Sequence, residues 1–189
     1  MRFLKSLVLL LAVSIFPLQG HAGEFADRML KAETLLTSGQ AKTAFAELDA
    51  IVDDIWTRSP MFVRQATFVS EINGYGDYKE RPAVFKPDEA HMIYVEPVAF
   101  GYGKMDDGKN VASWGVDYSL TGPAGSTLFE KEDFVELGVP LAGHNREVHL
   151  KLTINLSGLK PGSYVSNFLL KDKNSEKTTN FSLPFDIVE

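Results

Sequence analysis

The hydrophobic period of this chain changes once, from helical spacing to strict alternation, and this change restricts the fold more than any other feature of the sequence. Apolar residues recur at three and four positions from Glu24 to Trp56, whereas alternation begins near Met61 and continues to the end. A two-residue period predicts strands with one buried and one wet face, as in antiparallel sheets. We therefore expect an α+β protein with its helices first and its strands second.

Residues 23–60 are expected to form two amphipathic helices joined by Ser38-Gly39-Gln40. The apolar positions of the first helix are Phe25, Met29, Ala32, Leu35 and Leu36, and those of the second are Ala44, Phe45, Leu48, Ile51, Val52, Ile55 and Trp56. Gly39 suits the left-handed turn that ends a helix, and Pro60 prevents the second helix from continuing. Because the loop is short, the two helices must be antiparallel and share an apolar face.

A single tetratricopeptide-type unit resembles this hairpin in its small residues and its turn glycine: Ala32, Leu35, Gly39, Ala44 and Leu48. The resemblance covers roughly 34 residues, and no second copy follows, although stacked arrays need about three repeats. Two interpretations remain open, a true repeat scaffold and a lone hairpin packed on the neighbouring domain. We expect the lone hairpin.

The rest of the chain is expected to form a β-sandwich over residues 84–189, with residues 61–83 as a connecting segment. Apolar and polar residues alternate in the segments 92–100, 113–120, 147–156, 164–170 and 180–187, and Leu128, Phe129 and Phe134 mark a further strand. Turn-forming sequences separate the strands at 106–108, 122–125, 160–162 and 173–175. Six or seven short strands without intervening helices are typical of a sandwich.

The sequence from Leu159 to Tyr164, followed by Asp172, resembles the turn and penultimate strand of immunoglobulin-like and fibronectin-like sandwiches. The closing segment 183–187 is similar to the last strand of many secreted bacterial domains of this kind. The resemblance implies an immunoglobulin-like sandwich over residues 84–189 in which a tyrosine hydrogen-bonds back to the preceding corner. It implies no activity, because sandwiches host many unrelated functions.

The first 22 residues have the layout of a secretory signal peptide. Arg2 and Lys5 are followed by an apolar run over residues 7–16, and Gly20-His21-Ala22 supplies small residues for cleavage. The apolar run is too short to span a bilayer, and no later segment approaches the required length. We therefore expect a periplasmic or secreted protein without a membrane span.

Composition restricts the partners. The chain has no cysteine, which excludes disulfides, thiolate chemistry and a lipid anchor on an N-terminal cysteine. Without the two basic residues of the predicted signal peptide, 17 basic and 25 acidic residues remain, a formal charge of −8. This acidic balance argues against nucleic acid and anionic membranes, since both require concentrated Lys and Arg.

No sequence motif for catalysis or metal binding is present, and we expect no catalytic residue, metal ion or cofactor. His149 is expected on the outward, solvated face of its strand, whereas His91 and His144 lie beside turns. A hydrolase built on His91 or His144 remains an alternative, because catalytic triads are recognised by geometry. The sequence Asp106-Asp107-Gly108 is expected to form a hairpin turn and not a calcium loop.

Three tyrosines on glycine-rich segments, Tyr75, Tyr78 and Tyr102, are the candidate binding residues. Tyrosine offers a large, rigid ring with a polar tip and loses little entropy on binding. We expect a non-catalytic protein-binding or adaptor module of the bacterial cell envelope that engages another envelope protein through these rings or an edge strand. The alternatives are a carbohydrate- or small-ligand-binding module, and rings that merely pack on the rim. Trp56 and Trp114 are expected in the core, and the oligomeric state stays open.

Overall fold

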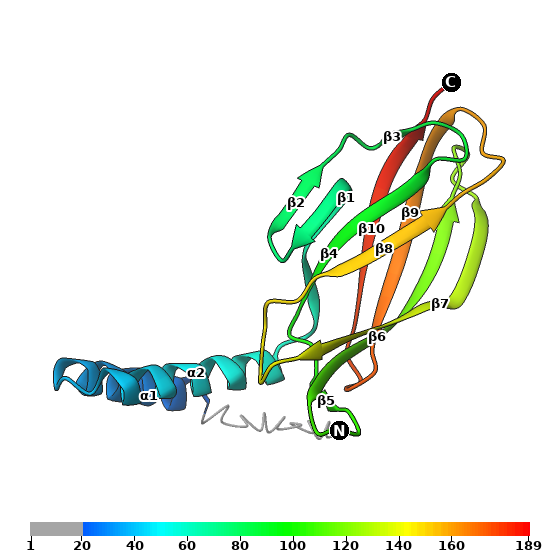
Figure 1. Ribbon diagram of the computed structural model, residues 1–189. Coiled ribbons are helices and arrows are strands. Elements are labelled where there is room, and N and C mark those ends of the chain that lie inside the picture. Colours follow the sequence, from blue (N-terminus) through cyan, green and yellow to red (C-terminus); the bar gives the residue numbers. More distant parts are fainter. Residues whose placement is uncertain (1–20) are drawn as a thin grey trace, which may run out of the picture. The chain divides into compact units, whose positions relative to one another are not determined.

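The computed structural model describes residues 21–189, so nearly all of the predicted signal peptide, 1–22, lies outside the described residues. Two packed helices are followed by two mostly antiparallel sheets that form a sandwich (Figure 1), as the sequence predicts. The chain divides into two compact units, one ending at Val52 and one from Asp53 to Glu189. Each unit is described by itself.

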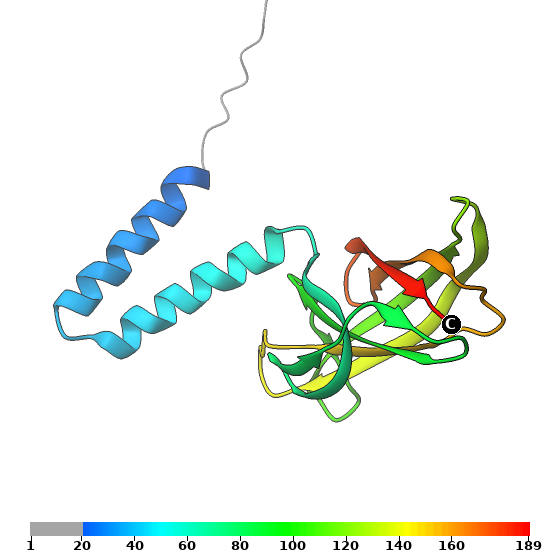
Figure 2. The same ribbon diagram turned by 90° about the horizontal axis from the view of Figure 1, so that it is seen from above.

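The helical hairpin consists of α1 (His21–Thr37) and α2 (Ala41–Arg58), which run antiparallel on either side of a short turn (Figure 2). Gly39 has a φ of 80° and makes this turn. Ala32 and Ala44 are buried, and such small side chains let two helices approach closely. Glu47 of α2 accepts hydrogen bonds from Lys31 at 2.8 Å and from Arg28 at 3.2 Å, and both lower the pKa of its carboxyl.

One sheet has four strands in the order β2-β1-β4-β8, namely β2 (Asp77–Glu80), β1 (Phe62–Gly74), β4 (Ala90–Val98) and β8 (Leu150–Asn155). The other sheet has the order β3-β10-β9-β6-β5, with β7 also paired to β6. Its strands are β3 (Val84–Phe85), β10 (Thr178–Ile187), β9 (Gly162–Asp172), β6 (Asn110–Thr121), β5 (Gly103–Lys104) and β7 (Thr127–Leu141). The pairing of β3 with β10 is parallel, an exception to the antiparallel arrangement that the alternation predicts.

The segment 61–83, which we expected to be a connection, contains the sandwich strands β1 and β2. Phe68 and Val69 of β1 are both buried, although neighbouring residues of a regular strand point to opposite faces. The register of β1 shifts after Val63 and again after Val69. Such bulges insert extra residues and break the two-residue period by which a strand is recognised in sequence.

The core lies between the two sheets and is rich in aromatic rings. Ile93 and Val95 of β4 belong to this core from one sheet, and Trp114 and Val116 of β6 from the other. All four are fully buried. Trp56 and Trp114 are both buried, as predicted. Tyr164 donates from its hydroxyl to the carbonyl of Lys160 at 2.8 Å, which confirms the tyrosine corner that the resemblance implies.

A half-buried ammonium joins the last turn of α2 to the sandwich strands of the same unit. Lys177 donates from Nζ to the carbonyls of Ala99, at 2.8 Å, and Trp56, at 3.1 Å. Burial lowers the pKa of this ammonium. The Trp56 ring donates from Nε1 to the carbonyl of Phe100 at 2.7 Å and meets the Phe100 ring edge-on. Lys177 therefore supplies a hydrogen-bond donor both to a carbonyl at the end of α2 (Trp56) and to a carbonyl of the loop after β4 (Ala99).

The substitution Lys177→Met should lower the free energy of unfolding by about 2 kcal/mol, because it leaves two part-buried carbonyls without a donor. The matched control is Lys173→Met, which removes an exposed ion pair with Glu136 and should leave the free energy of unfolding almost unchanged. Denaturant unfolding followed by fluorescence measures both values, since the two tryptophans lie in the sandwich unit. Equal costs for the two variants would contradict this role of Lys177.

His91 of β4 is enclosed by phenylalanine rings. It stacks on Phe85 at 3.7 Å between centroids, and Phe185 and Phe68 meet it edge-on at 4.6 and 5.7 Å. Neither ring nitrogen has a hydrogen-bond partner. Burial lowers the pKa of His91 to about 4, although Glu89 opposes the shift. The imidazole is therefore neutral at pH 7.

Acid should destabilise the sandwich through His91. The unfolded chain takes up a proton at this residue near pH 6.5, whereas the folded chain does so only near pH 4, so stability falls as the pH drops through this window. The loss attributable to His91 should be about 3 kcal/mol between pH 7.5 and pH 4. Unfolding free energies of the wild type and His91→Leu, measured across this range, check it. Identical pH slopes for the two proteins would contradict the assignment.

Candidate functional site

Three rings stack on the outer face of the four-stranded sheet. Ile93 and Val95 point into the core, so Tyr94 between them points outward. Its ring lies 4.0 Å from that of Tyr78 and 5.4 Å from that of His149, with both pairs close to parallel. Because these two rings cover Tyr94, it is fully buried on a face that would otherwise be wet. His149 is thus half-buried against a tyrosine, whereas we expected it to be freely solvated.

The Tyr94 hydroxyl organises the turn between β1 and β2. It accepts a hydrogen bond from the Gly76 amide at 2.7 Å and donates to Glu96 Oε1 at 2.6 Å. Burial and the hydrogen bond to Glu96 raise the pKa of Tyr94 well above its ordinary value. The phenol therefore stays neutral and donates to a buried carboxylate, which holds the glycine turn over the sheet.

Tyr75 and Tyr78 flank this turn, and both rings are half-buried. The Tyr75 hydroxyl accepts a hydrogen bond from Arg64 at 2.6 Å. Burial raises the pKa of Tyr75, and the carboxylates of Glu96 and Glu147 add to the shift. Tyr75 consequently lies within electrostatic reach of the loop that joins β7 to β8.

Tyr102, between β4 and β5, borders the same loop. Its ring stacks on His144 at 4.8 Å, and its hydroxyl donates to the carbonyl of Asn145 at 3.4 Å. Arg146 donates to Asp53 at 2.5 Å, and the Asp53 carboxylate also lies 4.0 Å from His144 Nδ1. Asp53 lies in the second half of α2 and belongs to the sandwich unit. Its carboxylate therefore holds His144 and Arg146 of the loop in place.

The two groups of tyrosines therefore meet one loop, residues 142–149, from two sides. His144 and Asn145 of the loop contact Tyr102, and Glu147 influences the Tyr75 hydroxyl electrostatically. His149 stacks on Tyr94 of β4, the ring on which Tyr78 also stacks. We call the set Tyr75, Tyr78, Tyr102, His144 and His149 the aromatic surface. Sequence reasoning found its three tyrosines but missed both histidines, because nothing in their spacing shows that they stack on tyrosines far away in the chain.

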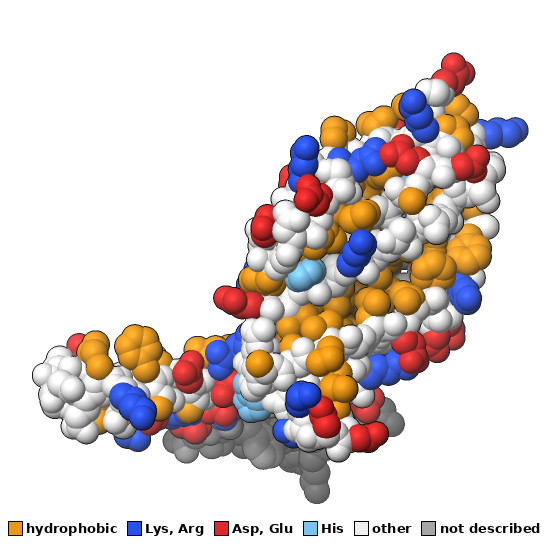
Figure 3. Space-filling model, viewed as in Figure 1, with side chains coloured by type: hydrophobic (Ala, Val, Ile, Leu, Met, Phe, Trp, Pro, Cys, Tyr) orange, Lys and Arg blue, Asp and Glu red, His pale blue; other side chains and the backbone are white. Residues whose placement is uncertain are grey.

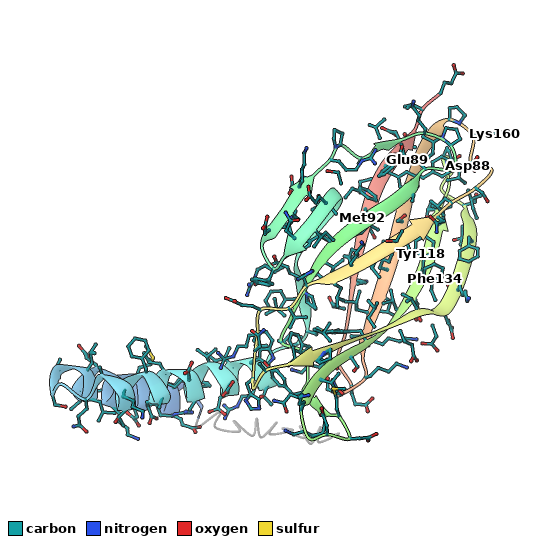
Figure 4. The ribbon with its side chains drawn as sticks, viewed as in Figure 1. Asp88, Glu89, Met92, Tyr118, Phe134 and Lys160 are labelled. Carbon is teal, nitrogen blue, oxygen red and sulfur yellow. The ribbon has the colours of Figure 1, made fainter. Side chains whose placement is uncertain are left out.

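A second feature is the open edge between the two sheets. Among the strands of residues 21–189, β7 is hydrogen-bonded only to β6, and β8 only to β4. A groove of about 240 Å³ separates them, lined by Phe134, Val135, Leu137, Lys151, Leu152, Thr153 and Ile154. Phe134, labelled in Figure 4, lines this groove, and its ring lies 5.3 Å from that of the buried Tyr118. Hydrophobic side chains are visible in this region in Figure 3. The strand β7, which forms this free edge, carries several acidic residues. Charged side chains on an edge strand discourage pairing with a strand of another molecule.

The histidines show no catalytic arrangement within residues 21–189. His91 is enclosed by rings, and no hydrogen bond joins a serine hydroxyl to His144 or His149 in this part of the chain. In the same residues no group of three or more His, Asp or Glu side chains could hold a metal ion. Gly108 has a φ of 80° and Asp107 accepts the Lys109 amide at 3.0 Å, which makes residues 105–109 a hairpin turn, as predicted.

No helix of the described residues combines the length and apolar character that crossing a membrane requires.

Comparisons with known proteins add little. No protein-family model matches the chain, and no curated protein matches it. Among solved structures, a superoxide reductase (neelaredoxin) from Ignicoccus hospitalis aligns with a TM-score of 0.34 and 12% sequence identity, over 67% of this chain and 82% of that chain. A likeness of this degree carries no argument about the present chain.

The substitution Tyr94→Phe should loosen the β1–β2 turn, because the Gly76 amide loses its acceptor and the buried Glu96 carboxylate loses its donor. Hydrogen exchange of the Gly76 amide should accelerate at least about tenfold, which corresponds to about 1.4 kcal/mol of local opening. Tyr118→Phe is the matched control, since its buried hydroxyl bonds to Ser166 in the other sheet. An unchanged exchange rate at Gly76 in Tyr94→Phe would show that the phenol does not hold the turn.

Proposed function

We propose that this chain is a non-catalytic protein-binding or adaptor module of the bacterial cell envelope, exported to the periplasm or beyond, and that its aromatic surface engages another envelope protein. The observation that carries this proposal is that one loop, residues 142–149, contacts Tyr102 directly and is linked to Tyr78 through Tyr94, on which both Tyr78 and His149 stack. A surface assembled from three separate parts of the chain offers a larger contact area than either tyrosine group alone.

The rings are held in place before any partner arrives. Tyr78 is stacked on Tyr94, Tyr102 on His144, and the Tyr75 hydroxyl is bonded to Arg64. Binding costs free energy when side chains must be ordered, so rings that are already fixed lose less on association. Tyrosine and arginine are also the residues that most often dominate protein–protein contacts.

The charges around the aromatic surface have both signs. Arg64 and Arg146 lie beside the acidic Glu147 and Asp53. A rim of mixed charge suits a folded protein partner, whose own surface carries both signs, better than a polyanion.

Export is supported by the arrangement of residues 1–22. We further assign the sandwich to the immunoglobulin-like or fibronectin-like type, which the Tyr164 corner supports, and the helical pair to a single tetratricopeptide-like unit. These assignments favour a scaffold that presents loops for recognition.

Capture of partners from a periplasmic extract tests the proposal. Changing Tyr75, Tyr78 and Tyr102 together to Ala should weaken capture at least about tenfold, because truncated aromatic contacts commonly cost more than about 1.4 kcal/mol. Phe129→Ala removes an exposed aromatic ring on β7 and is the matched control, expected to leave capture unchanged. Undiminished capture by the triple variant, with an unchanged melting temperature, would refute the role of the tyrosines.

The stacked, half-exposed rings also favour a second candidate, a carbohydrate- or small-ligand-binding module, since sugars bind against flat aromatic faces. A glycan array and a thermal-shift screen separate the two candidates. A ligand that binds only the folded protein raises its melting temperature. A sugar that does so in the wild type but not in the triple tyrosine variant would favour this candidate over the adaptor.

A further inference from the structure

We propose that one face of the helical hairpin, formed by Met29, Leu36, Phe45 and Val52, joins two copies of this chain in a four-helix bundle. This inference concerns the helical unit and stands apart from the function proposed for the sandwich. The four residues are called the hairpin face below.

The hairpin face is apolar and exposed. Met29 and Leu36 of α1 are 51% and 55% exposed, and Phe45 and Val52 of α2 are 65% and 42% exposed. Figure 3 shows hydrophobic side chains along one side of the hairpin. Large apolar residues at this exposure are ordinary when scattered, but four of them on one surface mark an interaction site.

Helical geometry places the four residues together. Each residue of a helix is rotated by about 100° from the last, so side chains seven apart, such as Met29 and Leu36 or Phe45 and Val52, point within about 20° of each other. The buried Ala32 and Ala44 mark the sides of α1 and α2 that face each other. Viewed along each helix from its N-terminus, Met29 and Leu36 are rotated from the Ala32 side in the same direction as Phe45 and Val52 are rotated from the Ala44 side. Because the two helices are antiparallel, rotation in the same direction brings both pairs to one face of the hairpin.

The spacing predicts a further layer of helices. Phe25, Met29, Ala32 and Leu36 are separated by four, three and four residues, and Phe45, Leu48 and Val52 by three and four. This is the pattern by which helices pack in coiled coils and four-helix bundles. A lone pair of helices buries only the side that its two members share. The apolar residues of the hairpin face become buried when a second pair of helices packs on them.

The size of the hairpin face suits a second copy. Four side chains exposed by about half present roughly 350 Å² of apolar surface, as large as the largest patch of a typical monomer. Two such faces bury roughly 700 Å² of apolar surface, and because interfaces are about 60% apolar this corresponds to roughly 1,200 Å² in total. That is the lower bound for a stable, specific interface.

Charge complementarity also favours a second copy. The bonds of Arg28 and Lys31 to Glu47 fix the register of the hairpin and place Glu33 at about the height of Lys42. Both residues are exposed, and each lies on the outer rim of the hairpin face. If a two-fold axis runs parallel to the helices, α1 of one copy packs on α2 of the other at the same height. Glu33 then meets Lys42 of the other copy twice in the dimer, once on each rim.

Sedimentation velocity over roughly 1–200 µM tests the proposal, with a dimer expected to form as the concentration rises. Phe45→Glu should weaken the dimer at least about tenfold, because it buries a charge in the hairpin face. Leu30→Glu is the matched control. Leu30 is 62% exposed but rotated about 100° from Met29, so its substitution should leave the dimer unchanged.

Charge exchange tests the arrangement of the two copies. Glu33→Lys and Lys42→Glu should each weaken the dimer about two- to fivefold at low salt, and the double variant should restore it. In the wild type, hydrogen exchange of α1 and α2 amides should slow as the dimer forms, a result that does not depend on any variant folding correctly.

A wild-type protein that stays monomeric throughout, or helix exchange independent of concentration, would overturn the proposal. A dimer that tolerates Phe45→Glu, or one that Leu30→Glu disrupts equally, would place the contact elsewhere and overturn it too. A double charge variant that fails to restore the dimer would overturn the proposed two-fold arrangement.

Discussion

The half-buried ammonium of Lys177 is the interaction on which the sandwich unit depends at its helical end. It donates to the carbonyls of Trp56 and Ala99, which belong to the last turn of α2 and to the segment after β4. Ala99 has a φ of 64°, a left-handed conformation that costs a residue other than glycine about 1–2 kcal/mol. The hydrogen bond from Lys177 holds this strained residue in place, and the rings of Trp56, Phe100 and Trp114 then meet edge-on in sequence toward the core.

The aromatic surface follows from this anchoring. Phe100 and Tyr102 are two residues apart, so the contact that fixes the Phe100 ring also limits where Tyr102 can lie. Tyr94 belongs to the same chain segment, on the outward face of β4, and supports the other tyrosines through its ring and its hydroxyl. A single central strand and its extension thus carry both halves of the surface, while the core packing on its other face keeps it rigid.

Local chemistry explains which parts of the fold were predictable. The helical hairpin, the later strands and the tyrosine corner each depend on residues close together in the chain, such as Gly39 at a turn or Tyr164 four residues after Lys160. The strand β1 escaped prediction because its bulges interrupt the alternation, and β2 did so because four residues are too few to show a period. The parallel pairing of β3 with β10 is likewise a long-range event that leaves no periodic signal in two residues.

The same distinction applies to the candidate site. The sequence alone determined that Tyr75, Tyr78 and Tyr102 stand outside the core pattern on glycine-rich segments, because a residue's place in a periodic pattern is a local property. Only the tertiary structure decided that His144 and His149 stack against tyrosines, and that His91 lies unbonded among phenylalanines. Contacts of this kind join residues tens of positions apart, and sheet pairing, which depends on the whole chain, sets which of them meet.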